Sequence, residues 1–166
     1  MATINGLTTL AIADVLSSDY LPIYDASAAT DKKTPLFEQS TWTPVVRFDG
    51  GATGVTYSAR TAYYVRMGPV VYVVADIRLS SKGAYTTESA DIAALPITSG
   101  SNPNSIISVR WVTTSTSYVY MVGVVPSSDS TIDLYGITAA ATTIGAVTAN
   151  GLGNSAILQI SGFYFA

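Results

Sequence analysis

The chain has 166 residues and a mass of 17.3 kDa, which corresponds to about one domain. It contains no Cys and no His, which excludes disulfides, thiolate nucleophiles, His general bases, Ser–His triads and nearly every structural zinc site. Charged residues make up only 11% and apolar residues 48%, which excludes disorder for most of the chain, and a net charge of −3 disfavours binding to nucleic acid or anionic lipid.

Small hydroxyl residues and β-formers dominate the composition. The chain has 21 Thr, 19 Ser and 11 Tyr but only three Lys and two Glu, so the common surface helix formers are nearly absent. Thr, Val, Ile and Tyr fit the half-buried surface of a sheet. The composition predicts an all-β protein with a neutral, hydroxyl-rich surface and no cofactor.

No targeting or membrane segment is expected. The start of the sequence, residues 1–6, has no basic stretch and no apolar core, so it does not match a signal peptide. The most apolar window, residues 69–77, is interrupted by Asp76 and is far shorter than the roughly 20 residues of a spanning helix. We expect synthesis in a cytosol and no membrane insertion.

The first 40 residues differ in charge and pattern from the rest. Five acids and two lysines give residues 1–40 a net charge of −3, whereas six acids and six bases cancel in residues 41–166. A short helix is possible around residues 8–17, and Thr34–Pro35 fits the start of a helical turn. We interpret residues 1–40 as a partly extended arm that docks the protein, and residues 41–166 as the globular body.

The body is predicted to be a series of short strands separated by Gly-, Pro- and Asn-rich breakers. Such spacing favours an antiparallel β-sandwich, jelly-roll-like, or a barrel. The expected strands are Thr43–Phe48, Val55–Ala59, Ala62–Met67, Val70–Leu79, Ile92–Leu95, Ile106–Val112, Tyr118–Val125, Thr131–Tyr135, Thr143–Val147 and Ala156–Phe165.

Two of these strands are apolar on both faces. In Val70–Leu79 one face is entirely apolar, and the other begins Val70, Tyr72, Val74 before Asp76 and Arg78. Tyr118–Val125 is apolar on both sides. Because a solvated antiparallel sheet alternates more cleanly, we expect the arm or another subunit to cover the second face, and we predict a homotrimer.

Several segments, in order along the chain, carry a resemblance to a known group. These segments are Asp19–Ser27 with the pattern D-x-x-P-x-Y-D-x-S, Thr30–Leu36, Trp42–Val46 beginning W-T-P, Tyr63–Val71 containing Y-x-R-x-G, Ala94–Ser99, and Ile160–Phe165. Together they resemble the docking segment and β-rich domain of phage tail-fibre and other virion appendage proteins.

This resemblance implies a trimeric β-sandwich virion component that often contacts host surface sugars. Leu21, Pro22, Ile23, Tyr24 and Asp25 would belong to its docking arm and contact other virion proteins. The sequence has no stalk between arm and body, which favours a compact knob, a short fibre or a decoration protein over a long fibre.

Acidic residues offer little that resembles a catalytic or metal site. Glu88 and Asp91 are the one close carboxylate pair near a loop, and we interpret them as solvated charges rather than as a glycosidase pair. The group Asp25, Ser27 and Asp31 lacks the turn Gly and bidentate Glu of a calcium loop. Asp129 and Asp133 are interpreted as loop or edge carboxylates. We therefore expect no enzyme activity and no metal.

Aromatic residues are the better candidates for ligand binding, because sugars stack on aromatic faces. Those on central strands are Tyr63, Tyr64, Tyr72, Trp111, Tyr118 and Tyr120, and for them a core or subunit-interface role is favoured. Tyr85, on a loop, and Tyr118 are the residues we assign to glycan contact. Polar loops near residues 80–90, 99–105, 113–117 and 126–130 are further candidates for host binding.

Three functions fit the sequence. The first is a non-enzymatic virion protein, a short fibre or knob that binds host surface polysaccharide. The second is a capsid decoration or head-fibre protein without a receptor role, and the third is a free carbohydrate-binding module. A docking arm of 40 residues disfavours the third.

Overall fold

The computed structural model describes residues 20–25, 30–35 and 37–166, which fall into two compact units, Met1–Glu38 and Gln39–Ala166. The first unit contains an antiparallel hairpin in which β1 (Tyr20–Asp25) pairs with β2 (Thr30–Pro35). The expected helical turn at Thr34–Pro35 is therefore wrong, because both residues lie in β2. The possible helix at residues 8–17 lies outside the described residues, and the arm–body division at residue 40 stays a prediction.

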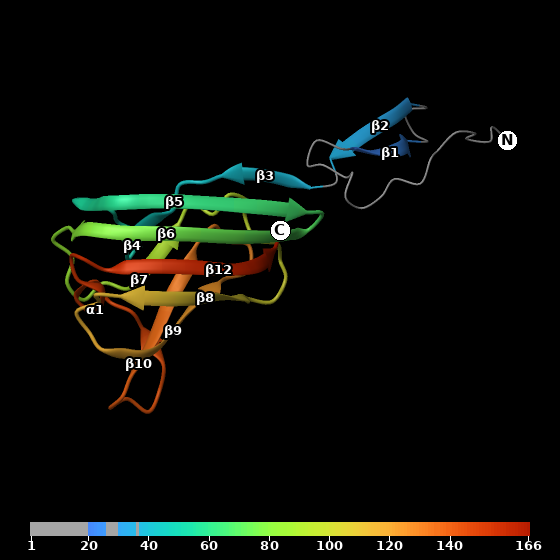
Figure 1. The fold of residues 1–166 in the computed structure, drawn as a ribbon. Coiled ribbons are helices and arrows are strands. Elements are labelled where there is room, and N and C mark those ends of the chain that lie inside the picture. The colour runs from blue at the N-terminus through green and yellow to red at the C-terminus, as the bar shows by residue number, and fades with distance from the viewer. Residues whose placement is uncertain (1–19, 26–29, 36) are drawn as a thin grey trace. The chain divides into compact units, whose positions relative to one another are not determined.

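The second unit is built on one long, curled sheet (Figure 1). Its strand order is β3-β5-β6-β12-β8-β9-β10-β7-β4, and β11 adds to β10. The elements are β3 (Glu38–Thr41), β4 (Val45–Phe48), β5 (Val55–Met67), β6 (Val70–Lys82), β7 (Ala90–Ala93), β8 (Ser105–Val112), β9 (Tyr118–Val125), β10 (Ile132–Thr138), β11 (Gly145–Ala146), α1 (Ala149–Leu152) and β12 (Ile157–Phe165).

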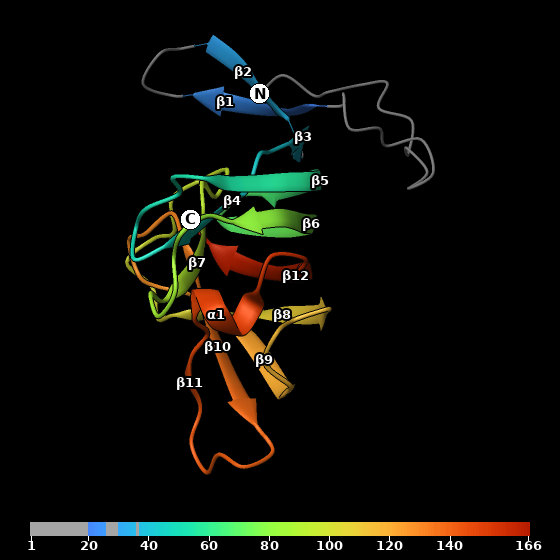
Figure 2. The ribbon, with the colours of Figure 1, turned by 90° about the vertical axis from the view of Figure 1, so that its left-hand side faces the viewer.

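The curl folds the sheet into two layers around one core. In Figure 1 the strands β5, β6, β12 and β8 run side by side across the view, and β9, β10 and β7 cross behind them. Figure 2 shows the same body from its side, with the long β10–β11 loop projecting below it. The core is filled from both layers by fully buried side chains such as Ile77, Leu158 and Ile160 on one side and Ile92 and Leu134 on the other. The predicted all-β antiparallel sandwich is confirmed.

Most expected strands are present, but two local predictions are wrong. We expected a break between Val55–Ala59 and Ala62–Met67, whereas β5 runs unbroken through residues 60–61 with regular pairing to β6, and its register shifts lie earlier, between Thr56 and Ala59. The loop expected at residues 150–154 contains α1 instead. Thr148 caps α1 by accepting a hydrogen bond from the Gly151 amide at 3.2 Å, and Gly153 ends it at a φ of 76°.

No helix among the described residues is long and apolar enough to cross a membrane.

Candidate functional site

The outer face of the β5-β6-β12-β8 layer carries the most distinctive surface of the molecule. Successive side chains of a strand point to opposite faces of the sheet. In β6 the residues Val71, Val73 and Ile77 are buried in the core, as the pattern predicted. The alternate residues, from Val70 to Arg78, therefore line the outer face.

Strand register arranges the outer face in rows that cross the sheet. Tyr63 of β5 is the register partner of Val74 of β6, Val74 of Ser161 on β12, and Ser161 of Ser108 on β8. The next row toward the β5–β6 turn contains Tyr72 and Phe163, whose ring centroids are 5.5 Å apart. The next row in the other direction is polar: Thr61, Asp76, Gln159 and Arg110.

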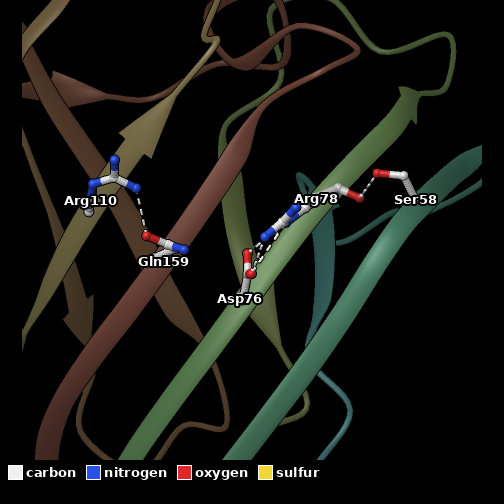
Figure 3. A network of polar contacts seen from close by, with 5 residues as sticks. All are labelled: Ser58, Asp76, Arg78, Arg110 and Gln159. Atoms are coloured by element: carbon white, nitrogen blue, oxygen red, sulfur yellow. Dashed lines mark hydrogen bonds and ion pairs between the residues drawn. The ribbon is translucent and has the colours of Figure 1, made fainter.

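The polar row, together with Arg78 beside it, forms a network of hydrogen-bonded side chains (Figure 3). The Arg78 Nη2 atom donates to Asp76 Oδ2 at 2.8 Å, and Arg110 Nη1 donates to Gln159 Oε1 at 2.7 Å. The hydrogen bond from Arg78 is the main reason that the pKa of Asp76 lies below its ordinary value, with Gln159 and Arg110 adding to the effect. Asp76 is therefore ionised at neutral pH. Exposed pairs of this kind contribute little to stability, so the network is better understood as a fixed set of donors and acceptors.

A groove of about 640 Å³ follows the row of small residues. Its floor includes Val74 and the hydroxyl residues Ser108 and Ser161, because these side chains are shorter than their neighbours in the adjoining rows. Tyr63 stands at one end and is 52% exposed. Asp76, Gln159 and Arg110 line the polar side of the groove.

This groove combines an aromatic face with oriented hydrogen-bonding groups. A pyranose ring has one apolar face that stacks on an aromatic ring and several hydroxyls that need donors and acceptors. Tyr63 supplies the aromatic surface, while the Asp76 carboxylate, the Arg110 guanidinium and the serine hydroxyls supply the polar partners. Sequence reasoning named Tyr63 only as one of a set of strand aromatics, because the register that joins it to Asp76 and Arg110 is not visible in the sequence.

Tyr85, the loop residue predicted to contact glycan, is turned toward the body. Its hydroxyl accepts a hydrogen bond from the Thr53 amide at 3.0 Å, and its ring lies 5.2 Å from that of Phe48. Gly51 leaves the space that the hydroxyl occupies. Half-buried in this way, Tyr85 has a structural role that sequence reasoning could not see, and its assignment to glycan contact stays a prediction.

Tyr118, the second predicted glycan residue, lies at the start of β9 and is also half-buried. Its ring lies over Gly136, and its hydroxyl lies beside Gly151 of α1. Burial raises the pKa of the Tyr118 hydroxyl. The structure does not bring Tyr85 and Tyr118 into the groove, and neither residue lines it.

The two acidic residues weighed as a catalytic pair, Glu88 and Asp91, have different hydrogen-bond partners. Asp91 accepts from Arg47 Nε at 2.9 Å, and the Glu88 carboxylate accepts from the Thr86 amide at 2.5 Å. Backbone hydrogen bonds, first that of Glu88 itself and then that of Thr86, lower the pKa of Glu88. Glu88 is therefore not held as a protonated acid at neutral pH.

A different carboxylate lies beside Asp91. Asp133 of β10 is its direct register partner, and a smaller cavity of about 230 Å³ is lined by both. Burial, followed by the nearby charges of Asp91 and Asp129, raises the pKa of Asp133. Within the ranges that the structure describes, no group of three or more acidic side chains is arranged to hold a metal ion.

The predicted docking residues Leu21–Asp25 all lie in β1, where they pair with the segment Thr30–Thr34 of β2. Ser27, weighed with Asp25 and Asp31 for calcium, lies outside the described residues. The docking role of β1 stays a prediction.

Comparison with known proteins gives one structural likeness. No protein-family profile matches the chain, and no curated protein matches it. Among solved structures, the crystal structure of the Dettilon tailspike protein (gp208) is similar, with a TM-score of 0.65 and 16% sequence identity. The likeness covers 78% of this chain but only 24% of the tailspike, so this chain spans about a quarter of that protein's length. At this identity the likeness shows that the fold is shared.

Proposed function

We propose that the protein is a non-enzymatic component of a phage virion, a short fibre or knob that docks through residues 1–40 and binds host surface polysaccharide with its β-sandwich body. The observation that carries the proposal is the shared fold with a phage tailspike over 78% of the chain. The order of the W-T-P and Y-x-R-x-G segments adds to it, and so does the net charge of −3 confined to the arm.

The groove on the outer face is the place where we expect polysaccharide to bind. Tyr63 is exposed and stands beside an ionised carboxylate, a guanidinium and two serine hydroxyls. Tyr85 and Tyr118, by contrast, are held by contacts within the body. A shallow and open site suits a repeating polymer, whose neighbouring units extend along the sheet.

The proposed binding involves no bond cleavage. Asp76, the one carboxylate that lines the groove, has a lowered pKa and is bound to Arg78, so it does not supply a proton at neutral pH. Glycoside hydrolysis requires a second carboxyl group across the scissile bond. Asp91 and Asp133, which do lie together, line a separate cavity.

The test is binding to an array of bacterial lipopolysaccharides and capsular polysaccharides, followed by a reducing-end assay on each polymer that binds. We expect binding without new reducing ends. The Y63A variant should weaken binding about 10-fold, which corresponds to one lost aromatic stacking contact. The matched control is Y120A, because Tyr120 is 51% exposed but does not line the groove.

Other outcomes would change the proposal. New reducing ends that disappear in E88Q or D91N would overturn the non-enzymatic reading. Absence of binding across the array, combined with incorporation into particles, would favour the capsid decoration protein. Binding by a protein that never associates with particles would favour the free carbohydrate-binding module.

A further inference from the structure

The outer face of the first layer has a second part, which the groove does not use. Toward the β5–β6 turn, its outward residues are all apolar. This apolar end consists of Val65, Met67, Val70, Tyr72, Ile106, Phe163 and Phe165. Phe163 is 63% exposed and Ile106 is 62% exposed, so the body itself leaves these side chains in water.

The register makes the apolar end one continuous surface. Met67 is the partner of Val70, and Val70 is the partner of Phe165, which completes a row across three strands. Tyr72 and Phe163 form the next row with their rings in contact. Side chains that meet along a ladder in this way form a patch, in contrast to the single exposed apolar residues that are common on protein surfaces.

The area is large for a surface that stays in water. With about 100 Å² of exposed apolar surface for each half-exposed large side chain, the apolar end presents on the order of 500 Å². A stable interface takes about 800 Å² from each partner, so the apolar end would form the apolar centre of such an interface, and the groove with Tyr63 would stay outside it.

The apolar end could be covered by a second copy of the chain or by the arm, residues 1–40, and charge distinguishes between these two occupants. The apolar end carries no ionisable charge; in the nearest charged row Arg78 is bound to Asp76, and Arg110, bound to the neutral Gln159, carries the remaining charge. A second copy of the apolar end therefore brings no charge to this surface. The arm, with five acids against two lysines, would bring carboxylates for which the apolar end offers no cation.

We infer that the apolar end is the surface through which copies of this chain contact one another. The inference rests on the proposed function, with the protein as a homotrimer, and it identifies the face through which the three copies would contact one another. The groove lies at the border of this face, so assembly would place the binding surfaces of neighbouring copies close together. Three weak sites held in this way would bind a repeating polymer with increased avidity.

The test uses the full chain and compares I106E/F163E with I144E. Ile144 is an exposed apolar residue, 48% exposed, on the β10–β11 loop away from this face, so its variant controls for the introduced charge. We expect light scattering to give three times 17.3 kDa for the wild type and I144E, and 17.3 kDa for I106E/F163E. A wild-type protein of 17.3 kDa, or a double variant that keeps the wild-type mass, would overturn the inference.

A second measurement covers the case in which the double variant fails to fold. Because the chain has no cysteine, F163C and I144C each introduce a single thiol. In the assembled protein the thiol at position 163 should react with a maleimide at least 10-fold more slowly than the thiol at position 144. Equal rates would contradict the inference, and protection of position 163 in a monomer would assign the face to the arm instead.

Failure of this inference can be separated from failure of the proposed function. If I106E/F163E keeps the wild-type mass while Y63A loses polysaccharide binding, the assembly face is wrong and the groove stands. If I106E/F163E becomes a monomer while no polysaccharide binds the wild type, the assembly face stands and the host-binding role is wrong.

Discussion

Tyr164 shows how a single buried polar group is accommodated in this body. Its ring is 1% exposed, and its hydroxyl donates to the Ile97 carbonyl at 2.7 Å. Burial raises the pKa of Tyr164 to about 12. The hydrogen bond thus joins the last strand to the loop after β7, and the phenol must keep its proton for that bond to form.

We predict that Y164F destabilises the protein by about 1 kcal/mol at pH 7 to 9, because the Ile97 carbonyl loses its donor. The folded pKa lies above the unfolded value near 10, so the contribution of Tyr164 is complete below pH 10 and is lost as the pH rises toward 12. The deficit of Y164F should shrink over that interval. Urea unfolding at pH 8, 10 and 11.5 measures it, and a constant deficit would contradict the prediction.

The sequence shows which aromatic residues lie on loops, but not which of them point into the body. Tyr85 is predicted to contact glycan because it is an aromatic residue on a loop. Its ring points inward, where the Thr53 amide donates a hydrogen bond to its hydroxyl and Gly51 leaves space for that hydroxyl. Those partners lie more than 30 residues away in the sequence, so local pattern could not identify them.

At the scale of elements, β9 illustrates both the success and the limit of the pattern. Its two apolar faces predict cover on both sides; Met121 and Val122 are both buried, whereas Val119 and Tyr120 are 59% and 51% exposed. The same reasoning on β6 identified the core face but gave no way to decide what covers the other face. That face remains exposed at Val74 and becomes polar at Asp76; the polar part is visible in the strand's own sequence, whereas the exposure of Val74 is not.

The presence of a strand could be predicted from the sequence where the hydrophobic alternation is long. The residues at which a strand begins and ends could not be predicted in the same way. Val70–Leu79 and Tyr118–Val125 were located within a few residues. The break expected in β5 is absent because Arg60 and Thr61 continue the regular pairing with Ile77 and Asp76 of β6. The short helix α1 was missed because its stability comes from the Thr148 cap and from burial of Leu152, and not from helix propensity.

Close packing across β9 gives a test at this scale. Gly123 lies where β9 passes between buried side chains, and an added Cβ would lie 2.5 Å from Ile132 Cγ2 and 3.3 Å from Ile107 Cβ. We predict that G123A lowers the free energy of unfolding by about 1–3 kcal/mol, as overpacking of a core does. The control is G145A in β11, where an added Cβ meets nothing within 4 Å. Equal urea midpoints for the two variants would contradict the packing described for β9.

At the scale of the whole molecule, the arm and the body should separate as folding units. The compact body begins near Gln39, and β3 (Glu38–Thr41) pairs with β5 at the edge of its sheet. A cut at residue 41, which the charge pattern alone suggests, would remove this strand and expose the edge of β5. A truncated chain of residues 37–166 keeps β3, so the edge of β5 stays paired.

We predict that residues 37–166 unfold in one cooperative transition but do not incorporate into virions, because they lack the segment that we propose as the docking arm. Calorimetry measures the first outcome, and particle association in a complementation assay measures the second. Normal incorporation of the truncated chain would show that the arm is not the anchor.

The place of β12 in the sheet has a consequence for how the molecule is made. Ile157–Phe165 lies between β6 and β8 and supplies Leu158, Ile160 and Tyr164 to the core (Figure 1). Strands β3 to β11 are synthesised first, yet β6 and β8 cannot be joined until this segment arrives. A nascent chain stopped before residue 157 would have an open sheet and an uncovered core, which are features that chaperones and proteases recognise. Chaperones and proteases would therefore remove interrupted translation products before assembly. Each assembled copy would then carry its complete central strand.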